Sequence, residues 1–205
     1  MSATFSIPAV TWTGPEINEW PLLEALPVSL GGVLRQNNGF IACAGGFHLR
    51  GICSMPDWHS LQAAMTGPRA IHRLFPHVRS SDIPFAEDCY GDQFLLRDFK
   101  VWHLDAETGT LHNLALSLKE FFGALATRPV DFLGLQPLVS FQEQGHQLAP
   151  DQSLLCWPPV STRQSADGLT VKAVGRNQHL EFLSGVARQM SQAKPGETFE
   201  FKLPD

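Results

Sequence analysis

A capped amphipathic helix near residue 120 constrains the fold of this chain most. Ser117 and Glu120 form a capping box, in which the serine hydroxyl accepts from a free backbone N–H and the glutamate reaches back to the cap residue. The apolar residues that follow have the spacing of one helix face: Leu118, Phe121, Phe122 and Leu125. This stripe must be buried, most simply against one face of a preceding sheet, and Pro129 ends the helix.

The residues before this helix predict the strands of that sheet. Residues 92–97 and Lys100–Asp105 contain short apolar runs, and the tetrapeptide at 106–109 makes a turn before residues 110–114. An antiparallel meander is therefore expected in the centre of the chain.

Weaker patterns lie on either side of the meander. We expect a helix from Pro27 to the Asn37-Asn38-Gly39 stop, a strand with a glycine break over residues 40–50, and a helix near residues 58–65. Residues 138–174 predict strands and loops without a clear period. A helix carrying Leu180, Leu183, Ala187 and Met190 ends at Pro195-Gly196, and an alternating strand follows at residues 198–203.

The composition is that of a globular protein. Of 205 residues, 43% are hydrophobic and 17% charged, and no apolar stretch approaches the roughly 20 residues of a membrane-spanning helix. Because no basic residue precedes Arg35, a secretory signal is not expected, and we predict a cytoplasmic protein. No polar linker divides the chain, so we expect one domain over 1–205, with a core at about 26–137 and a C-terminal elaboration at 138–205.

The negative charge is concentrated in one segment. The formal charge is −5, which argues against general nucleic-acid binding. Seven acidic residues lie in the segment, opposed by Arg97 and Lys100: Asp82, Glu87, Asp88, Asp92, Asp98, Asp105 and Glu107. They form an acidic face if their side chains point outward together; the alternative is a set of turn and rim carboxylates in water.

The cysteines do not form a recognisable framework. Cys43, Cys53, Cys89 and Cys156 include no C-x-x-C pair, so reduced structural thiols are expected, although four cysteines also allow three disulfide pairings.

The sequence carries no motif of a hydrolase, metalloprotease or nucleotide-binding protein. Two chemical alternatives compete with structural roles: a metal or acid–base site at Glu87, Asp88 and Asp92, and a nucleophile at Cys89. Turn caps and a buried thiol explain these residues more simply. We therefore expect no catalytic residue, no cofactor and no metal.

Several stretches together resemble the SUKH superfamily, which includes the Smi/Knr-type fungal cell-wall-assembly regulators and many bacterial immunity proteins. The resemblance is carried by Asn38-Gly39-Phe40, by Gly46-Phe47-His48-Leu49-Arg50-Gly51, by residues 84–95 (PFAEDCYGDQFL), by residues 105–109 (DAETG) and by the helix at Ser117-Leu118. It covers about residues 26–137. One departure is Phe99 in the turn after Asp98, where related sequences commonly carry glycine.

The resemblance implies an α+β fold, a largely antiparallel (mixed) sheet with helices packed on it, here with a C-terminal helix–strand extension. It also implies a non-catalytic immunity protein that binds a cognate toxin, often a nuclease or deaminase. The alternatives are a regulatory or scaffold protein of envelope or secretion-system assembly, and a small enzyme. No nucleic acid or membrane partner is expected, and the oligomeric state stays open.

The inhibitory hypothesis assigns the partner contact to acidic residues. An acidic surface can occupy the basic cleft of a nuclease, with apolar anchors supplying most of the affinity. The candidate contact residues are Glu87, Asp88, Asp92, Asp105 and Glu107. The competing interpretation is that Asp88 and Asp92 cap backbone amides.

Overall fold

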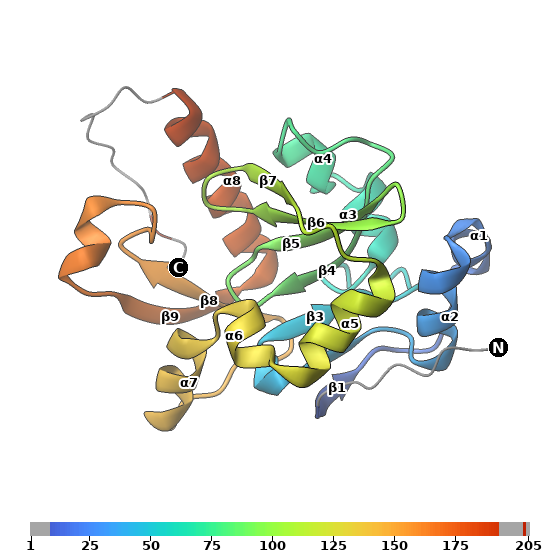
Figure 1. Cartoon of the computed structure of the whole chain (residues 1–205), viewed down its shortest axis with the longest axis horizontal. Coiled ribbons are helices and arrows are strands. Elements are labelled where there is room, and N and C mark those ends of the chain that lie inside the picture. Colours follow the sequence, from blue (N-terminus) through green and yellow to red (C-terminus); the bar gives the residue numbers. More distant parts are fainter. Residues whose placement is uncertain (1–8, 193–202, 204–205) are drawn as a thin grey trace.

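A computed structural model, which describes residues 9–192 and 203, has an α+β fold built on a seven-stranded antiparallel sheet (Figure 1). The strands are β1 (Val10–Thr13), β2 (Phe40–Ala42), β3 (Phe47–Leu49), β4 (Ile83–Asp88), β5 (Gln93–Arg97), β6 (Lys100–Asp105) and β7 (Thr110–Asn113). Their order in the sheet is their order in the chain, so the sheet is a simple meander. The α+β prediction is confirmed.

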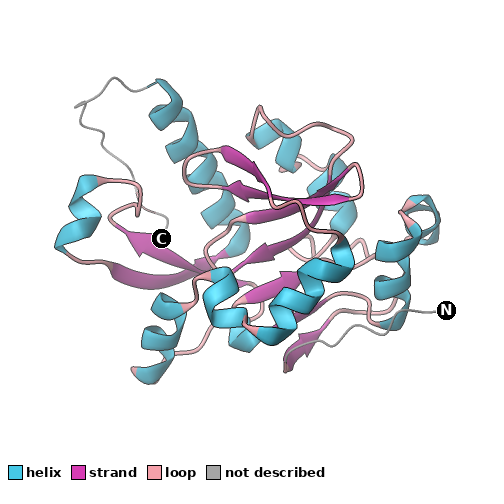
Figure 2. Cartoon of the chain, in the orientation of Figure 1, coloured by secondary structure: helices cyan, strands magenta, loops and turns pink. Residues whose placement is uncertain are grey.

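Helices lie on both sides of this sheet, and a separate hairpin lies at one end of its central strands (Figure 2). The helices are α1 (Trp20–Ala25), α2 (Val28–Gln36), α3 (Leu61–Thr66), α4 (Ile71–Leu74), α5 (Leu118–Thr127), α6 (Pro129–Leu133), α7 (Gln136–Glu143) and α8 (Arg176–Gln192), with 3₁₀ turns η1 (Cys43–Gly45) and η2 (Arg163–Asp167). The hairpin pairs β8 (Gln152–Trp157) with β9 (Thr170–Gly175). No helix of the described residues is long and apolar enough to cross a membrane.

The helix α5 forms as its sequence predicts. The Ser117 hydroxyl accepts from the Glu120 N–H at 3.3 Å, and the Glu120 carboxylate accepts from the Ser117 N–H at 2.7 Å. Its apolar stripe is buried on the sheet, with the ring centroids of Phe121 and Phe94 4.8 Å apart. The prediction of a capped helix on the sheet is confirmed.

The opposite face of the sheet is covered by α3, α4 and α8. Because successive strand residues point to opposite faces, Phe94 belongs to the α5 core, whereas Leu95 packs with Leu180, Leu183 and Ala187 of α8. The C-terminal helix therefore contributes directly to the core of the main sheet.

Several sequence expectations need correction. The strand expected over 40–50 is a hairpin of β2 and β3, because η1 turns the chain at Cys43 and Ala44, both with positive φ. The segment at 138–174 contributes the end of α7, which starts near Pro137, a residue well suited to a first helical turn. The sequence patterns do not predict five elements: β1, α1, α4, β4 and α6. The expected strand at 198–203 and the Pro195-Gly196 stop lie outside the described residues, apart from Leu203.

The hairpin between β5 and β6 uses a left-handed turn without glycine. Asp98 and Phe99 have φ of 51° and 62°, the signs of a type I′ turn. The Phe99 side chain is 77% exposed, so its packing does little to offset the unfavourable backbone conformation.

Replacing Phe99 with glycine should therefore stabilise the protein by about 1 kcal/mol, because glycine adopts positive φ without steric cost. Chemical denaturation of the full chain measures this difference. The Phe99→Ala control removes the ring but keeps the strain, and should leave stability within about 0.5 kcal/mol of the original. Equal stabilisation by alanine and glycine would contradict the backbone explanation.

Candidate functional site

A cavity of about 580 Å³ opens at the end of the sheet where the β4–β5 and β6–β7 turns lie. The sheet supplies one wall, including Phe94 and His103, and α6 supplies a second through Phe132 and Leu133. Residues of β8, of the loop that follows it and of α8 complete the lining. The part of the chain beyond residue 138 thus builds much of the cavity.

The β4–β5 turn is held by Asp88. Its Oδ1 atom accepts from the backbone N–H groups of Tyr90 at 2.8 Å and Asp92 at 3.1 Å. Gly91 is required in this turn, because its φ is 90° and a Cβ there would lie 2.7 Å from Cδ1 of Leu183 in α8. The acidic motif thus shapes the chain reversal at the cavity wall.

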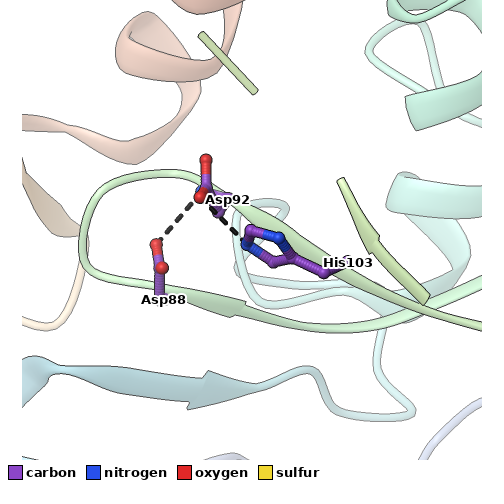
Figure 3. A group of neighbouring side chains, drawn as sticks. All are labelled: Asp88, Asp92 and His103. Carbon is purple, nitrogen blue, oxygen red and sulfur yellow. Dashed lines mark hydrogen bonds and ion pairs between the residues drawn. The ribbon is translucent and has the colours of Figure 1, made fainter. Parts of the chain in front are cut away.

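Asp92 joins this turn to the next hairpin. Its Oδ1 accepts from the Ala106 N–H at 2.8 Å, and its Oδ2 lies 3.0 Å from Nε2 of His103 (Figure 3). One ligand atom each from Asp88, Asp92 and His103 lies within 4.8 Å of the others, a spacing that a metal ion could use. The disfavoured metal alternative combined Asp88 and Asp92 with Glu87, whereas the structure brings them to His103.

The second turn of the motif uses Asp105 and Glu107. Asp105 Oδ1 accepts from the N–H groups of Glu107 at 3.0 Å and Thr108 at 2.9 Å. The Glu107 carboxylate accepts from the N–H groups of Val160 at 3.0 Å and Ser161 at 2.6 Å. Glu107 thereby fastens the loop after β8 to the end of the sheet.

The cavity lining contains several carboxyl groups and no strongly basic side chain among the described residues. Its carboxylates are Asp88, Asp92, Asp105 and Glu107, and no lysine or arginine among the described residues lines it. Burial, together with the neighbouring charge of Asp92, raises the pKa of Asp88 well above its ordinary value. Burial lowers the pKa of His179, another lining residue, to about 4, so that this ring is neutral at pH 7.

Glu87 points into the interior rather than into the cavity. Its carboxylate contacts Arg50 Nη2 at 2.7 Å, Arg176 Nη1 at 2.9 Å, His48 Nδ1 at 2.9 Å and Gln93 Nε2 at 3.2 Å. Burial opposes its ionisation, but the two arginines and the His48 contact hold the pKa of Glu87 well below its ordinary value. As an interior group, it can act on a partner only through the residues that it holds in place.

A chain of two histidines continues from Glu87. His48 Nε2 lies 2.8 Å from Nδ1 of His59, whose Nε2 lies 3.2 Å from the Asn38 carbonyl oxygen. Burial lowers the pKa of His48 to about 3 and that of His59 to about 4, so both rings are neutral at pH 7. Each neutral ring carries one N–H, so the two histidines supply two protons for the three contacts from Glu87 to the Asn38 carbonyl oxygen.

The acidic segment therefore does not form one outward face. Asp82 is buried in a two-pronged ion pair with Arg97, at 2.7 and 2.6 Å, and Glu87 is buried as described above. Asp98 is exposed, and the other four carboxylates line the cavity. Of the five proposed contact residues, the structure thus groups four and separates Glu87.

Cys89 lies between the acidic residues, but its surroundings are apolar. Burial raises the pKa of its thiol well above the ordinary value, which disfavours the reactive thiolate. All four cysteines are free in the structure.

Sequence reasoning missed Arg176 and the C-terminal cavity wall. Arg176 begins α8 and reaches Glu87 across 89 positions, a pairing that no local pattern reveals. Its Nη2 atom has no hydrogen-bond partner among the described residues, and its guanidinium lies 6.0 Å from the centre of the Trp58 ring. The apolar run at the centre of β8 and the stripe of α8 were the available signals for the wall.

No family model and no curated protein matches this chain. The likeness to the SUKH superfamily therefore depends on the motif residues alone, and the function that it implies is a proposal.

Replacing Arg176 with methionine should lower the free energy of unfolding by about 3–5 kcal/mol, because Glu87 loses one of its buried cationic partners. Denaturant unfolding of the full chain measures the loss. Arg188→Met, an exposed position on the same helix, is the matched control and should change stability by less than about 0.5 kcal/mol. Equal effects of the two variants would contradict a structural role for the Glu87–Arg176 pair.

Proposed function

We propose that this protein is a non-catalytic binding protein that neutralises a cognate toxin, in the manner of SUKH immunity proteins. The observation that carries the proposal is the cavity, which combines apolar walls with four carboxylates and, among the described residues, no lining lysine or arginine. A basic protein surface is the partner that this charge favours.

Charge complementarity and apolar contact have separate roles in such a complex. A nuclease or deaminase that acts on nucleic acid presents a basic substrate cleft, so an acidic surface increases the association rate and the specificity. Apolar side chains buried at the centre of the contact supply most of the affinity. The cavity offers both within one concave surface.

The hydrogen bonds of the motif support a binding role. The carboxylates of Asp88, Asp105 and Glu107 accept from backbone N–H groups, which fixes their positions before a partner arrives. Cys89, which the enzyme alternative would use as a nucleophile, is buried. The proposal includes a cytoplasmic location, where an inhibitor meets a toxin that attacks cytoplasmic nucleic acid.

The direct test is co-expression with the polypeptide encoded next to this protein. We expect the neighbouring polypeptide alone to stop host growth, and co-expression to restore survival with a complex that co-purifies. If the neighbour is not toxic and no complex forms, the immunity hypothesis is wrong and the scaffold alternative gains weight.

A positive charge at the cavity rim should weaken this complex. Leu169 lines the cavity and is 40% exposed, so Leu169→Arg adds a repulsive charge without opening the core. We expect at least a tenfold higher dissociation constant by calorimetry and reduced rescue of growth. Val28→Arg, at a position that is 91% exposed and outside the cavity lining, should leave both unchanged. Equal loss in the two variants would contradict binding at the cavity.

A further inference from the structure

We propose that the cavity receives an arginine side chain of the partner protein, together with an apolar residue next to it. This inference rests on the proposed function, because it names the group by which the partner is held. Its chemistry can nevertheless be tested on the free protein.

The carboxylates of the cavity retain unused acceptor atoms. Asp88 is only 3% exposed, yet it lines the cavity, and no described residue donates a hydrogen bond to its Oδ2 atom. Oδ2 of Asp105 is likewise without a donor among the described residues. No lysine or arginine of the described chain lines the cavity, so the protein itself places no cationic side chain beside these carboxyl groups. A cation from outside would supply both the donors and the missing charge.

The walls favour a guanidinium over other cations. Phe94, Phe132, Phe182 and Tyr90 contribute aromatic rings to the lining. A guanidinium is planar, stacks on aromatic rings, is more weakly hydrated than an ammonium and carries five N–H donors. It therefore suits a cavity whose surface is mostly apolar and whose acceptors are separate carboxylates.

A bare metal ion fits the carboxylates of the cavity less well than a guanidinium does. At the Asp88–Asp92–His103 group, Asp88 Oδ1 already accepts two backbone N–H groups, and both oxygens of Asp92 have partners. An ion there would find one unclaimed carboxylate oxygen, at Asp88, unless it displaced existing bonds. A guanidinium can donate to the unclaimed oxygens and leave the turn bonds intact.

The cavity is also larger than a metal site requires. Its volume of about 580 Å³ lies within the range of roughly 300–1,000 Å³ that is typical of pockets for drug-sized ligands. Apolar residues such as Leu133 and Leu155 line it beside the acidic groups. A peptide segment with one cationic and one or two apolar side chains matches a lining that is part acidic and part apolar.

The test is an NMR titration of the ¹⁵N-labelled full chain with the peptide acetyl-Leu-Arg-Leu-amide. The matched control replaces arginine with citrulline, which has nearly the same shape and no charge. We expect arginine-peptide shifts that map to the cavity lining and at least tenfold weaker binding of the citrulline peptide. No arginine-peptide binding, equal binding of both peptides, or shifts confined to another surface would overturn the inference. So would equally tight binding of agmatine, which would point to a free small cation.

Variants of the unused acceptors complete the test. Asp88→Asn keeps the turn-capping oxygen and removes the charge, so we expect at least fivefold weaker binding of the arginine peptide. Asp105→Asn should also weaken binding at least fivefold. If Asp88→Asn does not fold, Asp105→Asn alone tests the role of the unused acceptors. Asp131→Asn, at an exposed position on α6 outside the cavity lining, is the control and should bind normally. Unchanged binding in folded forms of both cavity variants would overturn the inference.

The outcome is separable from that of the proposed function. Growth rescue without arginine-peptide binding would leave the immunity proposal standing and remove the arginine anchor. If the arginine peptide binds but the neighbouring polypeptide is not toxic, the arginine site stands and the immunity proposal is wrong.

Discussion

The buried carboxylate of Glu87 is the interaction on which the rest of the structure depends. A charge with so little solvent contact is tolerated only when it is paired and hydrogen-bonded, and here the partners come from β3 and its end, from β5 and from α8. The pair with Arg176 fixes the start of α8 against the sheet. Since α8 carries one wall of the cavity, the geometry of that cavity depends on a contact in the interior.

Because side chains alternate along a strand, one short motif contributes both to the interior network of Glu87 and to the cavity. Glu87 and Asp88 are neighbours in β4, so their side chains point to opposite faces of the sheet. Glu87 joins the network beneath α8, whereas Asp88 caps the turn at the cavity. A cluster that reads as a single acidic patch along the chain is thus divided between the core and a binding surface.

The sequence predicts local features of this molecule well. The helix α5 and the β5–β7 meander follow from a capping box, helical spacing and turn residues, which act over a few positions. The cavity and the Glu87 network could not be predicted in this way, because they join residues that are up to 89 positions apart. The sequence motif places Glu87 and Asp88 side by side. Because β4 was not predicted, the motif did not show which of the two side chains faces the interior.

Native-state amide hydrogen exchange tests most directly whether Glu87 unites the sheet and α8. If it does, slowly exchanging amides in β4, β5 and the Leu180–Leu183 turn of α8 open with the same free energy, equal to that of global unfolding. A matching value in all three elements is the predicted result. If the α8 amides instead exchange through a separate opening of much lower free energy, the C-terminal helix is an independent unit and the central role assigned to Glu87 is wrong.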